Sequence, residues 1–261
     1  IELAPGTYRE VIELHSKNGI TIRAAESGTV KIDPTKRLPK KWELGKNGLW
    51  SLSYEEDIWQ LFCDSRLVYL ARWPDATFED GKIWRMMESC RSTDGGYNVH
   101  KGEWEGLTRL GLIYDDQFHV PARPGFTEGD SRYVFDPDIT FTNQPPSLAS
   151  TGIDFSGALA VLNIAHWLTY TQPIVSHDAG SDHFTYSTDL IGHKNSEIKH
   201  FKKRYASYHI LGLPALDQCN EWWYDQTENK IYYKPEIGAN PNELNLYARS
   251  VDFAVELTGC S

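Results

Sequence analysis

The chain of 261 residues lacks long apolar runs and contains only four cysteines and two methionines. No segment approaches the roughly 18 apolar residues that a membrane-spanning helix needs, so the sequence excludes such a helix. The cysteines, Cys63, Cys90, Cys219 and Cys260, form no Cys-x-x-Cys motif, which disfavours a metal or redox site built on thiols. An even count permits one or two disulfides, so disulfides and buried free thiols both stay open.

Sequence motifs of several common enzyme classes are also missing. There is no P-loop, no Gly-x-Gly-x-x-Gly, no His-Glu-x-x-His and no Gly-x-Ser-x-Gly, so nucleotide-dependent, zinc-protease and serine-hydrolase classes have no support. Acidic residues outnumber Lys and Arg by 36 to 26, which gives a formal charge of −10. Nucleic acids and anionic membranes need a cationic protein surface, so we predict no nucleic-acid partner and no membrane insertion.

Aromatic residues with a polar edge are abundant, with nine Trp and fourteen Tyr. Exposed rings of this kind stack on sugar faces, whereas buried ones pack a β-rich core. We take Trp73, Trp84 and Trp104 as candidates for exposed rings that line a substrate groove. Their burial in a core is the alternative, because most aromatic side chains are structural.

The periodicity of the chain predicts a mainly β fold with little helix. Short segments that alternate apolar and polar residues occur near both ends, at 11–14, 20–23, 30–33, 243–249 and 253–257. The first three follow one another too closely for helical crossovers, which fits either hairpins or successive sides of a solenoid coil. Between the ends, residues 74–150 contain few periodic runs and many Trp, Gly and Asp, and indicate a loop-rich insertion.

Three stretches give more definite local predictions. Residues 61–63 and 67–71, separated by a short polar turn, predict a tight hairpin. Residues 222–225 and 230–234 predict a second hairpin, rich in aromatic residues. The segment 208–216 is interpreted as one or two helical turns.

Several motifs resemble right-handed parallel β-helix proteins of the pectin-lyase-like superfamily. The opening Ile1-x-Leu3-x-Pro5-Gly6-x-Tyr8 and the segment 18–24 are similar to the first coils of these proteins. Further elements resemble one large, mostly secreted bacterial branch; they are Ala71-Arg72-Trp73-Pro74-Asp75, Gly157-Ala158 to Trp167, Leu216-Asp217 through Glu221-Trp222 to Asp225, and Ile231 to Pro235 with Asn240 to Glu243. Cys219 departs from the pattern, because the branch usually has Gly there.

The resemblance implies a parallel β-helix interrupted early by a β-rich insertion. It places the first coils at residues 1–33, the inserted domain at 34–243 and the return to coils at 244–261. The branch continues into many further coils that usually bear its catalytic groups, so the chain is interpreted as an N-terminal portion. An extracellular or periplasmic location is implied, although the chain itself shows no signal peptide.

The densest group of chemically active side chains lies at residues 177–183. His177, Asp178, Asp182 and His183 could bind a divalent ion or provide an acid–base pair for catalysis. No third ligand with regular spacing is evident for zinc. A surface turn in which Asp and Ser bond the backbone is the alternative interpretation.

Basic and acidic groups elsewhere offer weaker signals. Lys202, Lys203 and Arg204 belong to the one strongly basic run, which would contact an anionic polysaccharide or form a solvated loop. Arg204 joins the catalytic candidates because lyase chemistry needs a cation at the substrate carboxylate. No cofactor motif is evident; calcium stays open through Asp115-Asp116 and Asp136-Pro137-Asp138, neither of which has the spacing of a calcium loop.

The preferred hypothesis is an extracellular polysaccharide-acting protein that binds a polysaccharide or oligosaccharide. Lyase chemistry needs a charge-neutralising group, a base and an acid, whereas hydrolysis needs two carboxyl groups about 5 to 9 Å apart. Both kinds of residue are present, so lyase and glycoside hydrolase stay open, as does catalysis itself. The alternatives are a non-catalytic glycan-binding module and a structural module that associates with itself through open coil ends.

Overall fold

The computed structural model describes residues 1–79, 88–92, 110–115, 147–165, 169–187, 202–249 and 251–260. The regular elements in these ranges are β-strands and three short 3₁₀ helices, so the prediction of a mainly β chain is confirmed. None of the described segments is a helix both long and apolar enough to cross a membrane. The chain divides into two compact units, residues 1–70 with 218–261, and residues 71–217.

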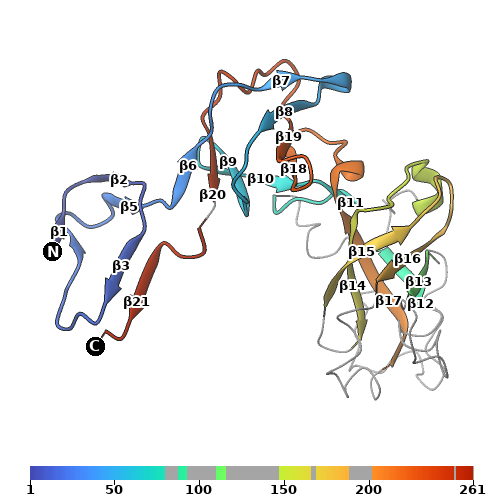
Figure 1. Ribbon diagram of the computed structural model, residues 1–261, viewed down its shortest axis with the longest axis horizontal. Coiled ribbons are helices and arrows are strands. Elements are labelled where there is room, and N and C mark those ends of the chain that lie inside the picture. Colours follow the sequence, from blue (N-terminus) through green and yellow to red (C-terminus); the bar gives the residue numbers. More distant parts are fainter. Residues whose placement is uncertain are drawn as a thin grey trace. The chain divides into compact units, whose positions relative to one another are not determined.

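The first unit consists of short strands from both ends of the sequence (Figure 1). They are β1 (Glu2–Leu3), β2 (Gly6–Tyr8), β3 (Ile12–His15), β4 (Arg23–Ala24), β5 (Val30–Ile32), β6 (Thr35–Arg37), β7 (Glu43–Leu44), β8 (Trp50–Ser53), β9 (Gln60–Cys63), β10 (Arg66–Leu70), β18 (Glu221–Asp225), β19 (Lys230–Lys234), β20 (Leu246–Arg249) and β21 (Val255–Thr258). A 3₁₀ helix, η1 (Lys46–Gly48), precedes β8.

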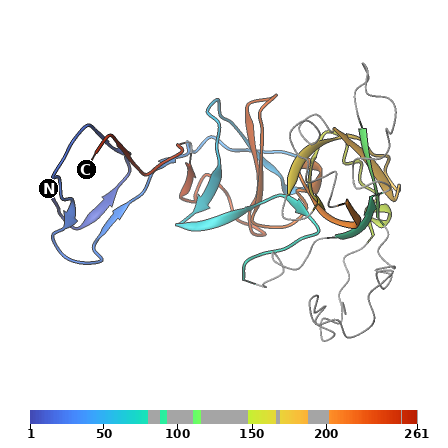
Figure 2. The same cartoon turned by 90° about the horizontal axis from the view of Figure 1, so that it is seen from below.

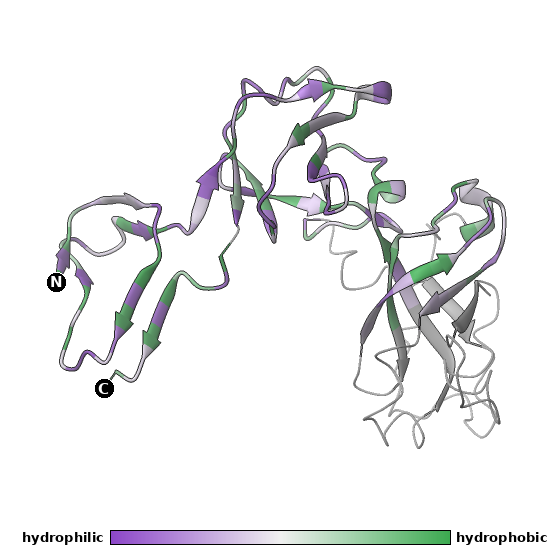
Figure 3. Cartoon of the chain, in the orientation of Figure 1, coloured by the Kyte–Doolittle hydropathy of each residue, from purple (hydrophilic) through white to green (hydrophobic). Residues whose placement is uncertain are grey.

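Six strands at the two ends of the chain form three separate parallel pairs. β1 pairs with β4, β2 with β5, and β3 with β21, each in parallel and with an unbroken register. The chain thus passes through β1, β2 and β3, and then places β4, β5 and β21 beside them in the same order. Hydrophobic and hydrophilic residues both occur along β3 and β21 (Figure 3). In β3 the hydrophobic residues form a half-buried face, whereas Val255 and Leu257 of β21 are exposed.

The other strands of this unit form an eight-stranded, mostly antiparallel sheet in the order β6-β20-β9-β10-β18-β19-β8-β7. Both predicted hairpins are confirmed: β9 pairs with β10, and β18 pairs with β19. Asp64 and Ser65 connect the first hairpin with positive φ angles of 46° and 70°, which suits the twist of a two-residue turn. One face of the sheet buries a core that includes Leu61, Trp222 and Ile231.

The second unit contains a seven-stranded antiparallel sheet. Its strands are β11 (Arg72–Trp73), β12 (Glu88–Ser92), β13 (Leu110–Asp115), β14 (Leu159–Ala165), β15 (Tyr170–Ser176), β16 (His183–Ser187) and β17 (Lys202–Leu211), with 3₁₀ helices η4 (Leu148–Thr151) and η5 (Leu213–Ala215). The order is β11-β17-β12-β13-β16-β15-β14, and β14 also pairs with β17. The sheet therefore curls until its last strand meets β17, and Figure 2 shows this curl.

Alternate residues of these strands point into the interior of the curled sheet. Ala160 and Leu162 of β14, Phe184 and Tyr186 of β16, and Tyr208 of β17 are all buried there. The interpretation of residues 208–216 as helical turns is wrong for most of its length. Strand β17 continues to Leu211 because burial alternates along it, and only Leu213–Ala215 forms a 3₁₀ turn.

Candidate functional site

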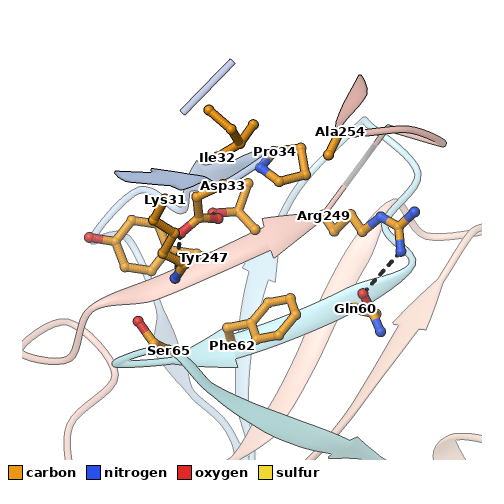
Figure 4. Close-up of a pocket in the computed structure, with 11 residues that line it drawn as sticks. Lys31, Ile32, Asp33, Pro34, Gln60, Phe62, Ser65, Tyr247, Arg249 and Ala254 are labelled. Carbon is orange, nitrogen blue, oxygen red and sulfur yellow. Dashed lines mark hydrogen bonds and ion pairs between the residues drawn. The ribbon is translucent and has the colours of Figure 1, made fainter. Parts of the chain in front are cut away.

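A pocket of about 350 Å³ lies in the first unit, beside β9 and β20 (Figure 4). Along β20, Leu246 and Ala248 are buried in the core, so Tyr247 and Arg249 lie on the opposite face of the strand. Along β9, Leu61 is in the core, and its neighbours Gln60 and Phe62 share the other face in the same way. Two-residue periodicity thus supplies one wall of the pocket.

Strand register brings these four side chains together. β9 and β20 are antiparallel, with Phe62 opposite Tyr247 and Gln60 opposite Arg249. Side chains directly opposite each other in an antiparallel pair have Cβ atoms about 5 Å apart. The pocket wall therefore has an aromatic end and a polar end, and Figure 4 shows Phe62 between them.

The segment that connects β5 to β6 forms the facing wall, and Asp33 anchors it. The Asp33 side chain accepts hydrogen bonds from Arg9 Nη1 at 2.6 Å and from Thr35 Oγ1 at 2.7 Å, and it pairs with Lys31 Nζ at 3.0 Å. Burial by itself would raise the pKa of this carboxyl, but the bonds from Thr35, Lys31 and Arg9 outweigh it and lower the pKa to about 2. Asp33 is therefore a fixed anion at neutral pH.

The Arg9–Asp33 ion pair also determines the position of Arg9 at the aromatic end of the pocket. The guanidinium of Arg9 lies over the ring of Tyr247, 4.2 Å from the centroid, in a cation–π contact. Arg9 thus links the Asp33 wall to the β20 wall.

Arg249 closes the polar end of the pocket. Its Nη1 donates to Gln60 Oε1 at 3.3 Å, and its Nε and Nη2 donate to the backbone carbonyls of Val251 and Asp252 at 3.0 and 2.6 Å. All three acceptors are uncharged oxygens. Within the described residues, no carboxylate pairs with this guanidinium.

The pocket is suited to binding a ligand and poorly suited to two-carboxylate hydrolysis. Asp33 is the one acid among the described residues that line it. A carboxyl whose pKa is about 2 stays ionised at neutral pH and cannot donate a proton as a general acid. The pocket offers hydrogen-bond donors, cations and an aromatic surface.

The predicted cluster at residues 177–183 lies in the second unit, where the chain turns from β15 to β16. A turn, the alternative interpretation of this segment, is present, since the backbone N–H of Ser181 donates to Asp178 O at 2.8 Å and Gly180 adopts a φ of 83°. Asp182 and His183 are exposed and adjacent, with Asp182 Oδ1 2.9 Å from His183 Nδ1. Asp178 is exposed too.

His177 differs from the rest of the cluster, because it is only 3% exposed. Its Nδ1 accepts from the backbone N–H of Phe155 at 3.2 Å, so the proton is on Nε2, which donates to Ser181 O at 3.2 Å. Ser156 Oγ additionally accepts from the backbone N–H of His177 at 2.9 Å. Both ring nitrogens are thus used inside the protein, and the structure gives His177 a role in holding the turn.

We expect His177→Ala to lower the free energy of unfolding of the second unit by about 1 to 2 kcal/mol, because two buried hydrogen bonds are lost. His183→Ala, on the exposed side of the same turn, serves as the control and should change the free energy by less than about 0.5 kcal/mol. Denaturant unfolding followed by circular dichroism measures both. Equal effects of the two substitutions would contradict the positioning role.

Three tryptophans, Trp73, Trp84 and Trp104, were the candidates for exposed rings in a substrate groove. The expectation that Trp73 is exposed is wrong, because its side chain is 5% exposed and packs in the core of the second unit. Its ring lies 6.1 Å from that of Phe155 and 6.0 Å from that of Tyr208, which leaves no face open to a sugar. Trp84 and Trp104 lie outside the described residues.

The basic candidates Lys202, Lys203 and Arg204 form the beginning of β17. Lys202 lies opposite Ala165 of β14 in the curled sheet. Their role as cations for an anionic polymer stays a prediction.

The remaining candidates for chemistry are metal-binding groups and thiols. In the described ranges, no group of three or more His, Cys, Asp or Glu residues is placed to hold a metal ion. Of the calcium candidates, Asp115 ends β13, and Asp116, Asp136 and Asp138 lie outside the described residues. Cys63, Cys219 and Cys260 are free thiols, and burial raises the pKa of Cys63.

Comparison with known proteins finds one informative likeness. Neither a family model nor a curated protein matches the sequence. A solved structure named "Glycoside hydrolase" is similar in fold, with a TM-score of 0.57 and 15% sequence identity. The match covers 98% of this chain and 40% of that protein, so the chain spans less than half of its length. At this identity the likeness shows a shared fold.

Proposed function

We propose that this chain is part of a carbohydrate-active, polysaccharide-acting protein, a polysaccharide lyase or a glycoside hydrolase. The observation that carries the proposal is the shared fold with a protein named glycoside hydrolase over 98% of the chain. The pocket beside β9 and β20 adds a surface with an aromatic ring and several donors, which is what sugar binding requires. We further propose a secreted location, as the resemblance to the secreted branch implies.

The parallel strand pairs support a β-helix as the framework of this protein. β4, β5 and β21 repeat the order of β1, β2 and β3 and pair with them in parallel, as two consecutive coils of a solenoid would. Crossovers between parallel strands are almost always right-handed, which favours a right-handed helix. In this scheme the coils occupy residues 1–33 and 244–261, with residues 34–243 inserted.

For the chemistry we retain the exposed part of the predicted cluster. Asp182 and His183 form a close acid–base pair at the surface, with Asp178 in the same turn. Arg204, Lys202 and Lys203 are proposed to contact an acidic polymer. His177 acts as a positioning residue.

The test is to incubate the protein, with and without calcium, with a panel of neutral and anionic polysaccharides. Ultraviolet absorbance of unsaturated products and reducing ends are followed together. An increase in both indicates β-elimination, and reducing ends without absorbance indicate hydrolysis. Asp182→Asn should lower either activity at least tenfold, whereas Asp154→Asn, a matched exposed acid in the same unit, should not. If the protein neither cleaves nor binds any of the polymers, the proposal is overturned.

A non-catalytic glycan-binding module is the second candidate. It is favoured by the pocket, where the one carboxylate of the described lining is locked in ion pairs. This candidate predicts saturable binding without new reducing ends. The open coil ends are a further proposed contact for self-association, since Val255 and Leu257 of β21 are exposed.

A further inference from the structure

The pocket beside β9 and β20 holds more positive than negative charge. Lys31 lines the pocket, and Arg9 lies behind the lining, where it contacts Asp33 and Tyr247. Arg9 and Lys31 share one carboxylate, that of Asp33, so this group of three carries a net charge of +1 at neutral pH. Arg249 adds another positive charge, and within the described residues no carboxylate compensates it. The chain as a whole carries −10, so the excess is a local property of this pocket.

The polar end of the pocket has hydrogen-bond donors that are not used within the described structure. A guanidinium has five N–H donors, and the three bonds of Arg249 do not use all of them. Gln60 accepts from Arg249 through Oε1, which directs its amide group to act as a donor; in the described structure that amide nitrogen has no acceptor. Two adjacent donor groups, one of them charged, are a typical arrangement for binding an oxyanion.

The middle of the pocket provides a surface for a ring. Phe62 is half-buried and lies between the Gln60–Arg249 end and the Tyr247–Ser65 end (Figure 4). Asp33 and Pro34 lie across the hollow from it. A volume of about 350 Å³ is at the lower end of the range for small-ligand sites, which suits one or two sugar units.

We propose that this pocket binds an acidic sugar unit. The carboxylate or sulfate of the sugar contacts Arg249 and Gln60, and its ring packs against Phe62. Asp33 takes no part in proton transfer and instead fixes Arg9 and Lys31 at the aromatic end. The inference rests on the proposed function in taking the ligand to be a saccharide, and it adds the charge of that saccharide and a site separate from the 177–183 turn.

The test compares sugars that differ only in charge. Binding of D-glucuronate and D-galacturonate is measured by NMR titration against D-glucose and D-galactose, and galactose 6-sulfate distinguishes a sulfate from a carboxylate ligand. We expect the charged sugars to bind at least tenfold more tightly than the neutral ones, about 1.4 kcal/mol. Added salt should weaken this preference, because the pocket is open to solvent.

Gln60→Glu is the decisive variant. The replacement has nearly the same shape and strengthens the contact to Arg249, so the fold is retained while the anion end is neutralised. Uronate binding should fall at least tenfold, and hexose binding should not change. Arg249→Gln should act in the same direction, with circular dichroism to confirm folding. Lys40→Gln, an exposed cation outside the pocket, is the matched control and should leave the preference unchanged.

Two results would overturn the inference. Equal binding of uronate and hexose by the unchanged protein removes its basis, and so does a uronate preference that survives Gln60→Glu. In either case, a polysaccharide that is still bound or cleaved shows that the proposed function stands and only the pocket assignment fails. If the unchanged protein bound no saccharide at all, both the pocket assignment and the proposed function would be overturned.

Discussion

Replacing Trp222 by alanine is expected to lower the free energy of unfolding of the first unit by about 3 to 5 kcal/mol. Trp222 is 1% exposed and packs in the same cluster as Leu61 and Ile231. Its Nε1 also donates to the backbone carbonyl of Val68 at 3.1 Å. Because β18 and β10 are a parallel pair that joins residues far apart in the sequence, this side chain secures a long-range contact of the sheet.

Two further variants separate the contributions. Trp222→Phe retains most of the apolar contact but leaves the Val68 carbonyl without its donor, so a loss of about 1 to 3 kcal/mol is expected. Trp223→Ala, at the half-buried neighbouring position, is the control with a smaller expected loss. Urea denaturation followed by far-ultraviolet circular dichroism measures all three. A loss below about 1 kcal/mol for Trp222→Ala would contradict the assigned core.

Asp33→Asn is expected to remove about 2 kcal/mol from the free energy of unfolding at neutral pH. The pKa of Asp33 is about 2 in the folded chain, against an ordinary value of 3.8. A depressed pKa in the folded state means that the ion pairs stabilise the protein fully above about pH 5. That stabilisation is lost as the pH falls from there to about 2, where the folded carboxyl takes up its proton.

The substitution therefore has a pH signature. The difference between the unchanged protein and Asp33→Asn should be largest above about pH 5 and should shrink towards zero near pH 2. Denaturation at several pH values measures it, and Glu10→Gln, which removes an exposed carboxyl next to Arg9, is the control. A difference that does not depend on pH would show that packing, and not the ion pairs, explains any loss.

The sequence was informative where the structure is local. Both hairpins were predicted from short segments, because Asp64-Ser65 and the turn before Lys230 connect strands that are neighbours in the chain. The turn at 178–181 was indicated, as the alternative interpretation of that segment, by its Asp and Ser residues for the same reason. These elements depend on interactions a few residues apart, which the pattern of residue types records.

The pocket could not be predicted in the same way. Phe62 and Tyr247 belong to different ends of the sequence, and only the pairing of β9 with β20 makes them neighbours. Alternation at 243–249 indicated a strand, but alternation does not say which strand is its partner. Residue type also does not predict burial. A tryptophan such as Trp73 can belong to a sugar-binding surface or to a core, and its packing against Phe155 shows that it belongs to the core.

The histidine cluster shows a related limit. His177 and His183 are equivalent in type and lie in one turn, yet one is buried and the other is exposed. The difference arises because the backbone N–H of Phe155, more than twenty residues earlier, donates to His177. The residue pattern therefore located the turn correctly, and the tertiary contact divided its members into a buried and an exposed part.

The pairing of β3 with β21 has a consequence for the integrity of the protein. Together with the contacts of β20 to β6 and β9, it holds the first and the last parts of the chain together by noncovalent contacts. A protease that cuts the exposed turn at Asp64 and Ser65 would produce two fragments whose strands remain paired along several ladders. We therefore expect the first unit to behave as a split protein, in which two separately made pieces complement each other.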